Sequence, residues 1–121
     1  MQLKFEVLSD VLRVEIRERE TAEETREIAE RTFAERDKHG VLAILMVMRD
    51  SRPIFKVEEY GLSGILQRIA AIPGLRVASV AEDAALHSAH DYVEFLARQR
   101  DTALRAFTSE KDALAWLREP R

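Results

Sequence analysis

Two short runs of alternating apolar and polar residues stand at the start of the chain. Residues 3–8 and residues 11–17 each carry apolar side chains at every second position. Ser9 and Asp10 separate the two runs. Alternating runs joined by a short polar turn are typical of two antiparallel strands. The first 17 residues therefore predict a β-hairpin.

A helix is predicted directly after the hairpin. Thr21 and Glu24 have the spacing of a capping box, in which the threonine side chain accepts a hydrogen bond from an early helix amide. The glutamate side chain then reaches back to the threonine amide. Apolar residues recur at helical spacing to about His39, and Gly40 is suited to end the helix. Charged residues cover the remaining positions, which favours a surface helix packed on a sheet.

The run 41–48 is continuously apolar. It begins after Gly40 and ends before the polar residues Arg49, Asp50 and Ser51. A short apolar run with such boundaries predicts a strand that is buried on both faces, as in the middle of a parallel sheet.

Strand and helix patterns alternate from this run to the end of the chain. Such alternation predicts parallel strands joined by right-handed crossovers. We therefore expect an α/β fold in which a β-hairpin is followed by alternating helices and strands, giving a five-stranded, mostly parallel mixed sheet with four helices. The expected elements after the central run are an irregular stretch at 49–59, helices at 62–72, 84–100 and from 109 onward, and strands at 75–81 and 102–107.

The composition fits a globular chain with one domain. The length of 121 residues suits one hydrophobic core, and 46% hydrophobic with 34% charged residues excludes a disordered chain. The absence of cysteine excludes disulfides, thiolate metal sites and cysteine nucleophiles. Residues 1–6 lack the pattern of a signal peptide, and the run 41–48 is too short to cross a bilayer. We expect a cytoplasmic protein without a transmembrane segment, with peripheral membrane contact left open.

The net charge of −3 argues against nucleic acid as a partner, because phosphate binding needs a basic excess. The sequence also lacks the glycine-rich, nucleophile-elbow and zinc-protease motifs that would indicate an enzyme. We therefore expect no catalytic residues and no cofactor.

The order of elements resembles the SpoIIAA-like fold, which STAS domains share with a SpoIIAA-like family. The topological resemblance covers nearly the whole chain, so residues 1–121 are interpreted as one SpoIIAA-like (STAS-type) domain. The motif resemblance covers about the last third. The residues that carry it are Leu-Arg-Val-Ala-Ser-Val-Ala at 75–81, Ala-Phe-Thr-Ser at 106–109 and Asp-Ala-Leu-Ala-Trp-Leu at 112–117.

The resemblance implies two kinds of function. Anti-sigma-factor antagonists of the STAS type carry an Asp-Ser-Ser-Gly turn whose serine is phosphorylated. The corresponding positions here read Gly61, Leu62, Ser63 and Gly64, so only Ser63 and the glycine after it match. The broader SpoIIAA-like family instead implies a small lipophilic ligand or an association with membranes.

Arg49 and Asp50 are the first candidate ligand-binding residues. They follow the central strand, and open α/β sheets bind ligands beyond the carboxyl ends of their strands. Arg49 or Arg52 would then hold a carboxylate. The alternative is a polar turn with solvated arginines.

Ile54, Phe55, Val57 and Tyr60 place four large apolar groups in the irregular stretch. They are interpreted either as the lining or cover of an apolar pocket or as a partner surface. The alternative is that they close one edge of the sheet.

Ser63 would stand at the start of a helix, where free amides and the helix dipole favour an anion or a phosphoryl group. The alternative is a capping or first-turn serine.

His87 and His90 are three residues apart, a spacing that can share a metal ion on a helix. A metal site needs further ligands, so we expect none and interpret His90 as a packing residue. Tyr92 and Phe95 fall outside the apolar stripe of the same helix. They indicate contact with the last helix or a homodimer.

The leading hypothesis is a non-enzymatic binding or regulatory module for a small apolar or amphipathic ligand or for a regulatory protein. The candidate ligand-binding residues are Arg49, Asp50, Ile54, Phe55, Tyr60 and Ser63. The alternative is a phospho-switch of the anti-sigma-factor-antagonist type that uses Ser63. An enzyme would be favoured if Arg49, Asp50, His87 and His90 surrounded one cavity.

Overall fold

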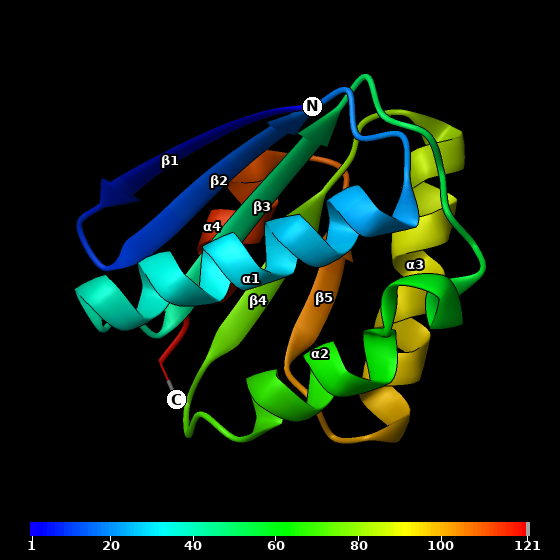
Figure 1. Ribbon diagram of the computed structural model, residues 1–121. Coiled ribbons are helices and arrows are strands. Elements are labelled where there is room, and N and C mark those ends of the chain that lie inside the picture. Colours follow the sequence, from blue (N-terminus) through cyan, green and yellow to red (C-terminus); the bar gives the residue numbers. More distant parts are fainter. Residues whose placement is uncertain (121) are drawn as a thin grey trace.

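A computed structural model describes residues 1–120 of the chain. It consists of one five-stranded sheet with helices on both faces (Figure 1). The elements are β1 (Gln2–Leu8), β2 (Val11–Arg17), α1 (Ala22–His39), β3 (Ala43–Arg49), the 3₁₀ helix η1 (Val57–Tyr60), α2 (Leu62–Ala70), β4 (Arg76–Val80), α3 (Ala84–Gln99), β5 (Leu104–Phe107) and α4 (Glu110–Leu117).

The strands lie side by side in the order in which they occur along the chain, β1-β2-β3-β4-β5. β1 is antiparallel to β2, and every later neighbour is parallel to the strand before it. The predicted fold class is confirmed: a hairpin followed by alternating helices and strands gives a mixed, mostly parallel sheet with four helices. Successive right-handed crossovers in one direction place their helices on the same face. Accordingly α1, α2 and α3 share one face of the sheet.

β3 is the central strand, with β2 on one side and β4 on the other. Neighbouring side chains of β3 face opposite sides of the sheet and enter different hydrophobic clusters. Ile44 packs with Phe33, Leu66 and Val77 beneath the three helices. Leu45 faces the opposite way and packs with Leu117 of α4 and its neighbours. The strand predicted to be buried on both faces is confirmed, although it begins at Ala43 rather than at residue 41.

α1 begins and ends as the sequence predicts. The Thr21 side chain accepts a hydrogen bond from the Glu24 amide at 3.1 Å, and a Glu24 carboxylate oxygen accepts one from the Thr21 amide at 2.9 Å. Gly40 ends the helix with φ 65°, in the left-handed region that glycine occupies without a steric penalty. Residues at or next to each end of α1 therefore determine where the helix begins and ends.

The second face of the sheet is covered by α4 and by charged side chains. Arg13 of β2 donates to Glu110 at the start of α4, at 2.8 Å, and to Glu6 and Glu15, both at 3.1 Å. The bond to Glu110 raises the pKa of Arg13 most strongly, and Arg13 in turn lowers the pKa of Glu15. This network fixes the first turn of α4 against β2.

The irregular stretch after β3 contains η1 and leads directly into α2. Gly61 ends η1 and precedes the first residue of α2 with φ 72°. Ser63 is thus a first-turn residue of α2, and Gly61 occupies the capping position.

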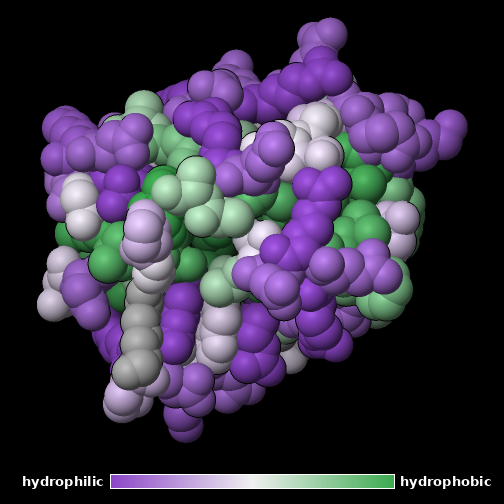
Figure 2. All heavy atoms as spheres, turned by 90° about the horizontal axis from the view of Figure 1, so that it is seen from below, coloured by the Kyte–Doolittle hydropathy of each residue, from purple (hydrophilic) through white to green (hydrophobic). Residues whose placement is uncertain are grey.

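Figure 2 shows the molecule from the end at which β3, β4 and β5 begin. Hydrophilic side chains cover most of this end, with hydrophobic areas between them. A shallow groove of about 330 Å³ is lined here by residues around Ile72, Pro73 and Ala103. No polar side chain other than those of Arg76, Asp101 and Thr102 lines it within the described part of the chain.

Candidate ligand-binding site

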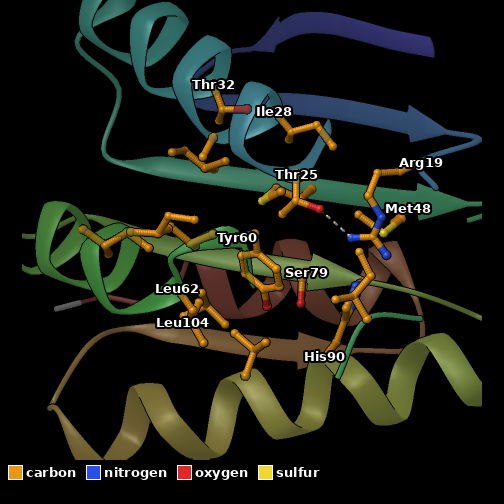
Figure 3. A pocket seen from close by; sticks show the side chains of 18 of the residues that line it. Arg19, Thr25, Ile28, Thr32, Met48, Tyr60, Leu62, Ser79, His90 and Leu104 are labelled. Carbon is orange, nitrogen blue, oxygen red and sulfur yellow. Dashed lines mark hydrogen bonds between the residues drawn. The ribbon is translucent and has the colours of Figure 1, made fainter. Parts of the chain in front are cut away.

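A cavity of about 120 Å³ lies between the sheet and the helices α1, α2 and α3. Its walls are mainly aliphatic, because it lies within the cluster that joins these helices to β3 and β4. Six polar side chains also reach it (Figure 3). The apolar lining consists of Ile28, Ala29, Phe33, Ile44, Met46, Met48, Ile54, Leu62, Ile65, Ile69, Val77, Ala89, Val93 and Leu104, and the polar lining of Arg19, Thr25, Thr32, Tyr60, Ser79 and His90.

Arg19 is the charged residue of the cavity. It lies between β2 and α1, and only 5% of its surface is exposed. Its Nη1 donates to the Thr25 hydroxyl at 3.2 Å, and its Nη2 donates to the Arg52 carbonyl oxygen. Its Nε is buried and has no hydrogen-bond partner within residues 1–120. Donors of this buried guanidinium therefore remain unused, although buried polar groups are nearly always paired.

No carboxylate of residues 1–120 forms an ion pair with Arg19. Two glutamates that follow it in sequence pair elsewhere, Glu20 with Arg52 and Glu24 with the N-terminal amine, each at 3.7 Å. Burial lowers the pKa of the Arg19 guanidinium, while Tyr60 and these two glutamates raise it at longer range. Arginine nevertheless keeps its proton in proteins, so the cavity contains a cation without a close counter-ion.

His90 of α3 reaches the same end of the cavity as Arg19 (Figure 3). The residue is partly buried, but its Nδ1 is fully enclosed and lacks a hydrogen-bond partner among residues 1–120. Burial lowers the pKa of His90 to about 4, and the charges of Arg19 and His87 act in the same direction. The imidazole is thus neutral at pH 7 and offers one donor and one acceptor.

Tyr60 and Ser79 add hydroxyl groups to the middle of the cavity (Figure 3). Tyr60 ends η1 and is buried. Burial raises the pKa of Tyr60 to about 12, so its hydroxyl keeps its proton at neutral pH. Thr32 contributes a further buried hydroxyl, and this oxygen has no hydrogen-bond partner within the described residues.

Hydrogen bonds of three arginines join the segment between β3 and α2 to α1 and to the connection before it. The Arg52 amide donates to the Arg19 carbonyl oxygen at 3.0 Å, and the Arg19 amide donates to the Ser51 hydroxyl at 3.0 Å. Arg26 of α1 donates to the Glu59 carbonyl oxygen of η1. These bonds position Ile54 and Tyr60 at the cavity and fix the backbone from which Arg19 enters it.

The predicted ligand-binding residues do not all meet at one place. Ile54 and Tyr60 line the cavity. Phe55, between them in sequence, is 52% exposed and is not among the lining residues. The irregular stretch therefore divides its apolar side chains between the interior and the surface.

Arg49 and Asp50 line a separate, polar pocket of about 680 Å³ at the carboxyl ends of β2, β3 and β4. All three arginines of this pocket form ion pairs. Arg17 pairs with Asp50 at 3.1 Å, and Arg49 pairs with Glu110 at 3.5 Å. Arg52 at its rim pairs with Glu20. Acidic side chains outnumber the arginines in the lining, so this pocket is less suited to an anion than the cavity around Arg19.

Ser63 is exposed and lies in a third hollow, of about 270 Å³, beside Arg100. The Arg100 guanidinium donates to the Ser63 carbonyl oxygen at 3.2 Å. Ser63 is on the outer side of α2 and does not line the interior cavity.

His90 lines the cavity, whereas His87 forms a pair with Asp91 at 3.3 Å. No group of three His, Asp, Glu or Cys side chains within residues 1–120 is arranged to hold a metal ion. Arg49 and Asp50 line the polar pocket instead, so the four residues of the enzyme hypothesis do not surround one cavity. Tyr92 and Phe95 are 41% and 52% exposed, and the last helix does not cover them.

The sequence interpretation missed Arg19, Thr25, Thr32, Ser79 and His90 as residues of one site. Arg19 occurs in the run Arg-Glu-Arg-Glu at 17–20, which has the composition of a solvated turn. Only the packing of residues 51–54 over this turn encloses the guanidinium. For His90 the single signal in the sequence is its place on the apolar stripe of α3, which by itself indicates a packing residue.

A comparison with models of known protein families finds no match, and a comparison with curated proteins finds none either. No helix within residues 1–120 combines the length and the apolar composition needed to cross a membrane.

Proposed function

We propose that this protein is a non-enzymatic binding module of the SpoIIAA-like type that takes up a small amphipathic ligand in the cavity around Arg19. The order of elements and the apolar side chains of residues 54–60 are the sequence features that support it. The cavity supports it, because ligand sites are mostly apolar hollows with a few convergent polar groups. Its polar groups come from the connection between β2 and α1 and from four further elements, α1, α3, β4 and η1.

One observation carries the proposal: a buried arginine faces an apolar cavity and keeps unused donors. A cavity in a protein core reduces stability, and an unpaired buried charge reduces it further. A bound ligand with an apolar body and a polar end would offset both costs. A merely imperfect core would not be expected to collect six polar side chains at one void.

The test is binding of small compounds to the purified chain and to a variant whose cavity is filled. We expect benzyl alcohol, benzamide or benzoate to shift NMR signals of cavity-lining residues in the wild type. The substitution Ala89→Leu adds three carbon atoms to a lining residue that is buried. It should abolish these shifts while leaving the free energy of unfolding unchanged or raising it by up to about 1 kcal/mol, because the side chain fills a void.

Ala85→Leu is the matched control, since Ala85 lies on the same helix but is exposed. It should bind the compounds as the wild type does. The proposal is wrong if none of the three compounds binds and native mass spectrometry of gently purified protein shows only the mass of the free chain. Equal binding to the wild type and to the Ala89→Leu variant would also contradict it.

A phospho-switch at Ser63 is the second candidate, and one observation favours it. Ser63 is an exposed first-turn residue of α2 with the Arg100 guanidinium beside it. A phosphate on the hydroxyl would be stabilised by both the helix dipole and the arginine. We expect mass spectrometry of the protein from its native cells to find phosphate on Ser63.

Ser109 serves as the internal control for this measurement. Its hydroxyl caps α4 by accepting a hydrogen bond from the Asp112 amide at 3.2 Å, so we expect it to remain unmodified. An unmodified Ser63 across growth conditions, or equal modification of both serines, would argue against a switch at Ser63.

A further inference from the structure

The charge that Arg19 places in the cavity has no counter-ion, and this narrows the class of ligand. We propose that the ligand is a small monocarboxylic acid, bound as its anion with the carboxylate against Arg19 and with an apolar group of one ring or one short branched chain. This inference rests on the proposed function, because it names the chemistry of the same ligand.

The first argument is charge. Only 5% of the surface of Arg19 is exposed, and no acidic side chain of residues 1–120 pairs with it. A buried ion is tolerated when it is paired and hydrogen-bonded. A ligand with a negative group would supply the missing partner, whereas a neutral ligand would leave the charge as it is.

The second argument is the pattern of donors. Arg19 uses Nη1 for Thr25 and Nη2 for the Arg52 carbonyl oxygen, and Nε has no partner. A guanidinium has five N–H groups in a planar fork that fits the two oxygens of a carboxylate. His90 at the same end is neutral at pH 7 and can donate one further hydrogen bond.

The third argument separates a carboxylate from larger anions. One arginine is the only cation that lines the cavity among the described residues. A phosphate monoester carries nearly two charges and three acceptor oxygens, and its burial would require more than one cation. A carboxylate carries one negative charge, which matches the single positive charge of Arg19.

The fourth argument is size. The cavity measures about 120 Å³. An apolar cavity of about 150 Å³ in another protein takes up one benzene molecule, so a single ring or a short branched chain is the upper limit here. A long-chain fatty acid is too large to lie wholly within this volume. The aliphatic lining from α1, α2 and β3 matches such a compact apolar group.

The experiment compares ligands that differ in one property. Benzoate and benzamide have nearly the same shape, but only benzoate is charged at pH 7. Isothermal titration of the full chain should show benzoate binding at least about tenfold more tightly than benzamide, because a hydrogen bond to an ion is stronger than one between neutral groups. 3-Methylbutanoate should bind more tightly than 3-methylbutanamide by a similar factor. Dodecanoate and phenyl phosphate should not compete with benzoate for the cavity.

Two arginine variants locate the effect. Arg19→Gln keeps a hydrogen-bonding side chain but removes the charge. The variant should therefore bind benzoate and benzamide with about equal affinity. Arg26→Gln is the matched control: Arg26 also donates to a carbonyl of the segment that precedes α2, but it is exposed and does not line the cavity. Its preference for benzoate should stay unchanged.

The outcomes separate this inference from the proposed function. Equal affinity of the wild type for benzoate and benzamide would contradict the assignment of a carboxylic acid as the ligand. The proposal of a binding module would still stand. Tighter binding of phenyl phosphate or dodecanoate than of benzoate would overturn the assigned class. If none of the compounds binds, both proposals fail. Should Arg19→Gln not fold, the comparison of charged and neutral ligands on the wild type decides alone.

Discussion

Replacing Leu45 by alanine is expected to lower the free energy of unfolding by about 2–5 kcal/mol. Leu45 lies in the middle of β3 with none of its surface exposed, and its neighbours across the sheet are Arg13 of β2 and Ala78 of β4. It packs with Ala113 and Leu117 of α4. The truncation removes three carbon atoms from a side chain enclosed by β2, β4 and α4. These elements cannot move together to close the void.

Urea titration of the wild type and of the Leu45→Ala variant measures this effect. Val7→Ala is the control, because Val7 lies on the edge strand β1 and is 42% exposed. The control should change the free energy of unfolding by less than about 0.5 kcal/mol. A Leu45→Ala variant as stable as this control would show that α4 does not pack on β3 as described.

Acid should destabilise the protein through His90, and a His90→Gln variant should be spared this loss. The pKa of His90 is about 4 in the folded chain because burial disfavours the charged imidazole. An unfolded chain protonates histidine with a pKa of about 6.5. Below that value the unfolded state binds a proton that the folded state does not, so stability is lost as the pH falls from about 6.5 toward about 4.

The expected loss of unfolding free energy follows from these two pKa values of His90. Between about pH 7 and pH 5 the wild type should lose about 2 kcal/mol more unfolding free energy than His90→Gln does. His87 is present in both proteins, so its own contribution cancels. Denaturant titration at several pH values measures the difference. Parallel curves for the two proteins would mean that the imidazole is accessible to water and not enclosed at the cavity.

The turn between β2 and α1 contributes both to the cavity and to the expected acid sensitivity. Arg19 enters the interior there, and its charge lowers the pKa of His90 in addition to the effect of burial. The same turn is bonded through its backbone to Ser51 and Arg52. The site therefore depends on two connecting segments, 18–21 and 50–56, that lie far apart in sequence and meet beyond the carboxyl ends of β2 and β3.

Local patterns along the chain determined the elements and the fold class. The capping box at Thr21, the left-handed glycine at 40 and the apolar run that became β3 each act within a few residues, so the sequence specifies them directly. Parallel pairing followed from the alternation of strands and helices. The apolar side chains of the irregular segment indicated a pocket lining or a surface, and the structure shows both, since Ile54 and Tyr60 line the cavity while Phe55 is exposed.

Only the tertiary structure decided where the unpaired charge lies. Arg17 and Arg19 are two residues apart and share Glu18 as a neighbour, yet Arg17 pairs with Asp50 at the surface whereas Arg19 is buried. The pleat of β2 and the path of the chain after it turn Arg17 outward and bring Arg19 under residues 51–54. Burial of a charge depends on which distant segments cover it, and that information does not reside in a run of neighbouring residues.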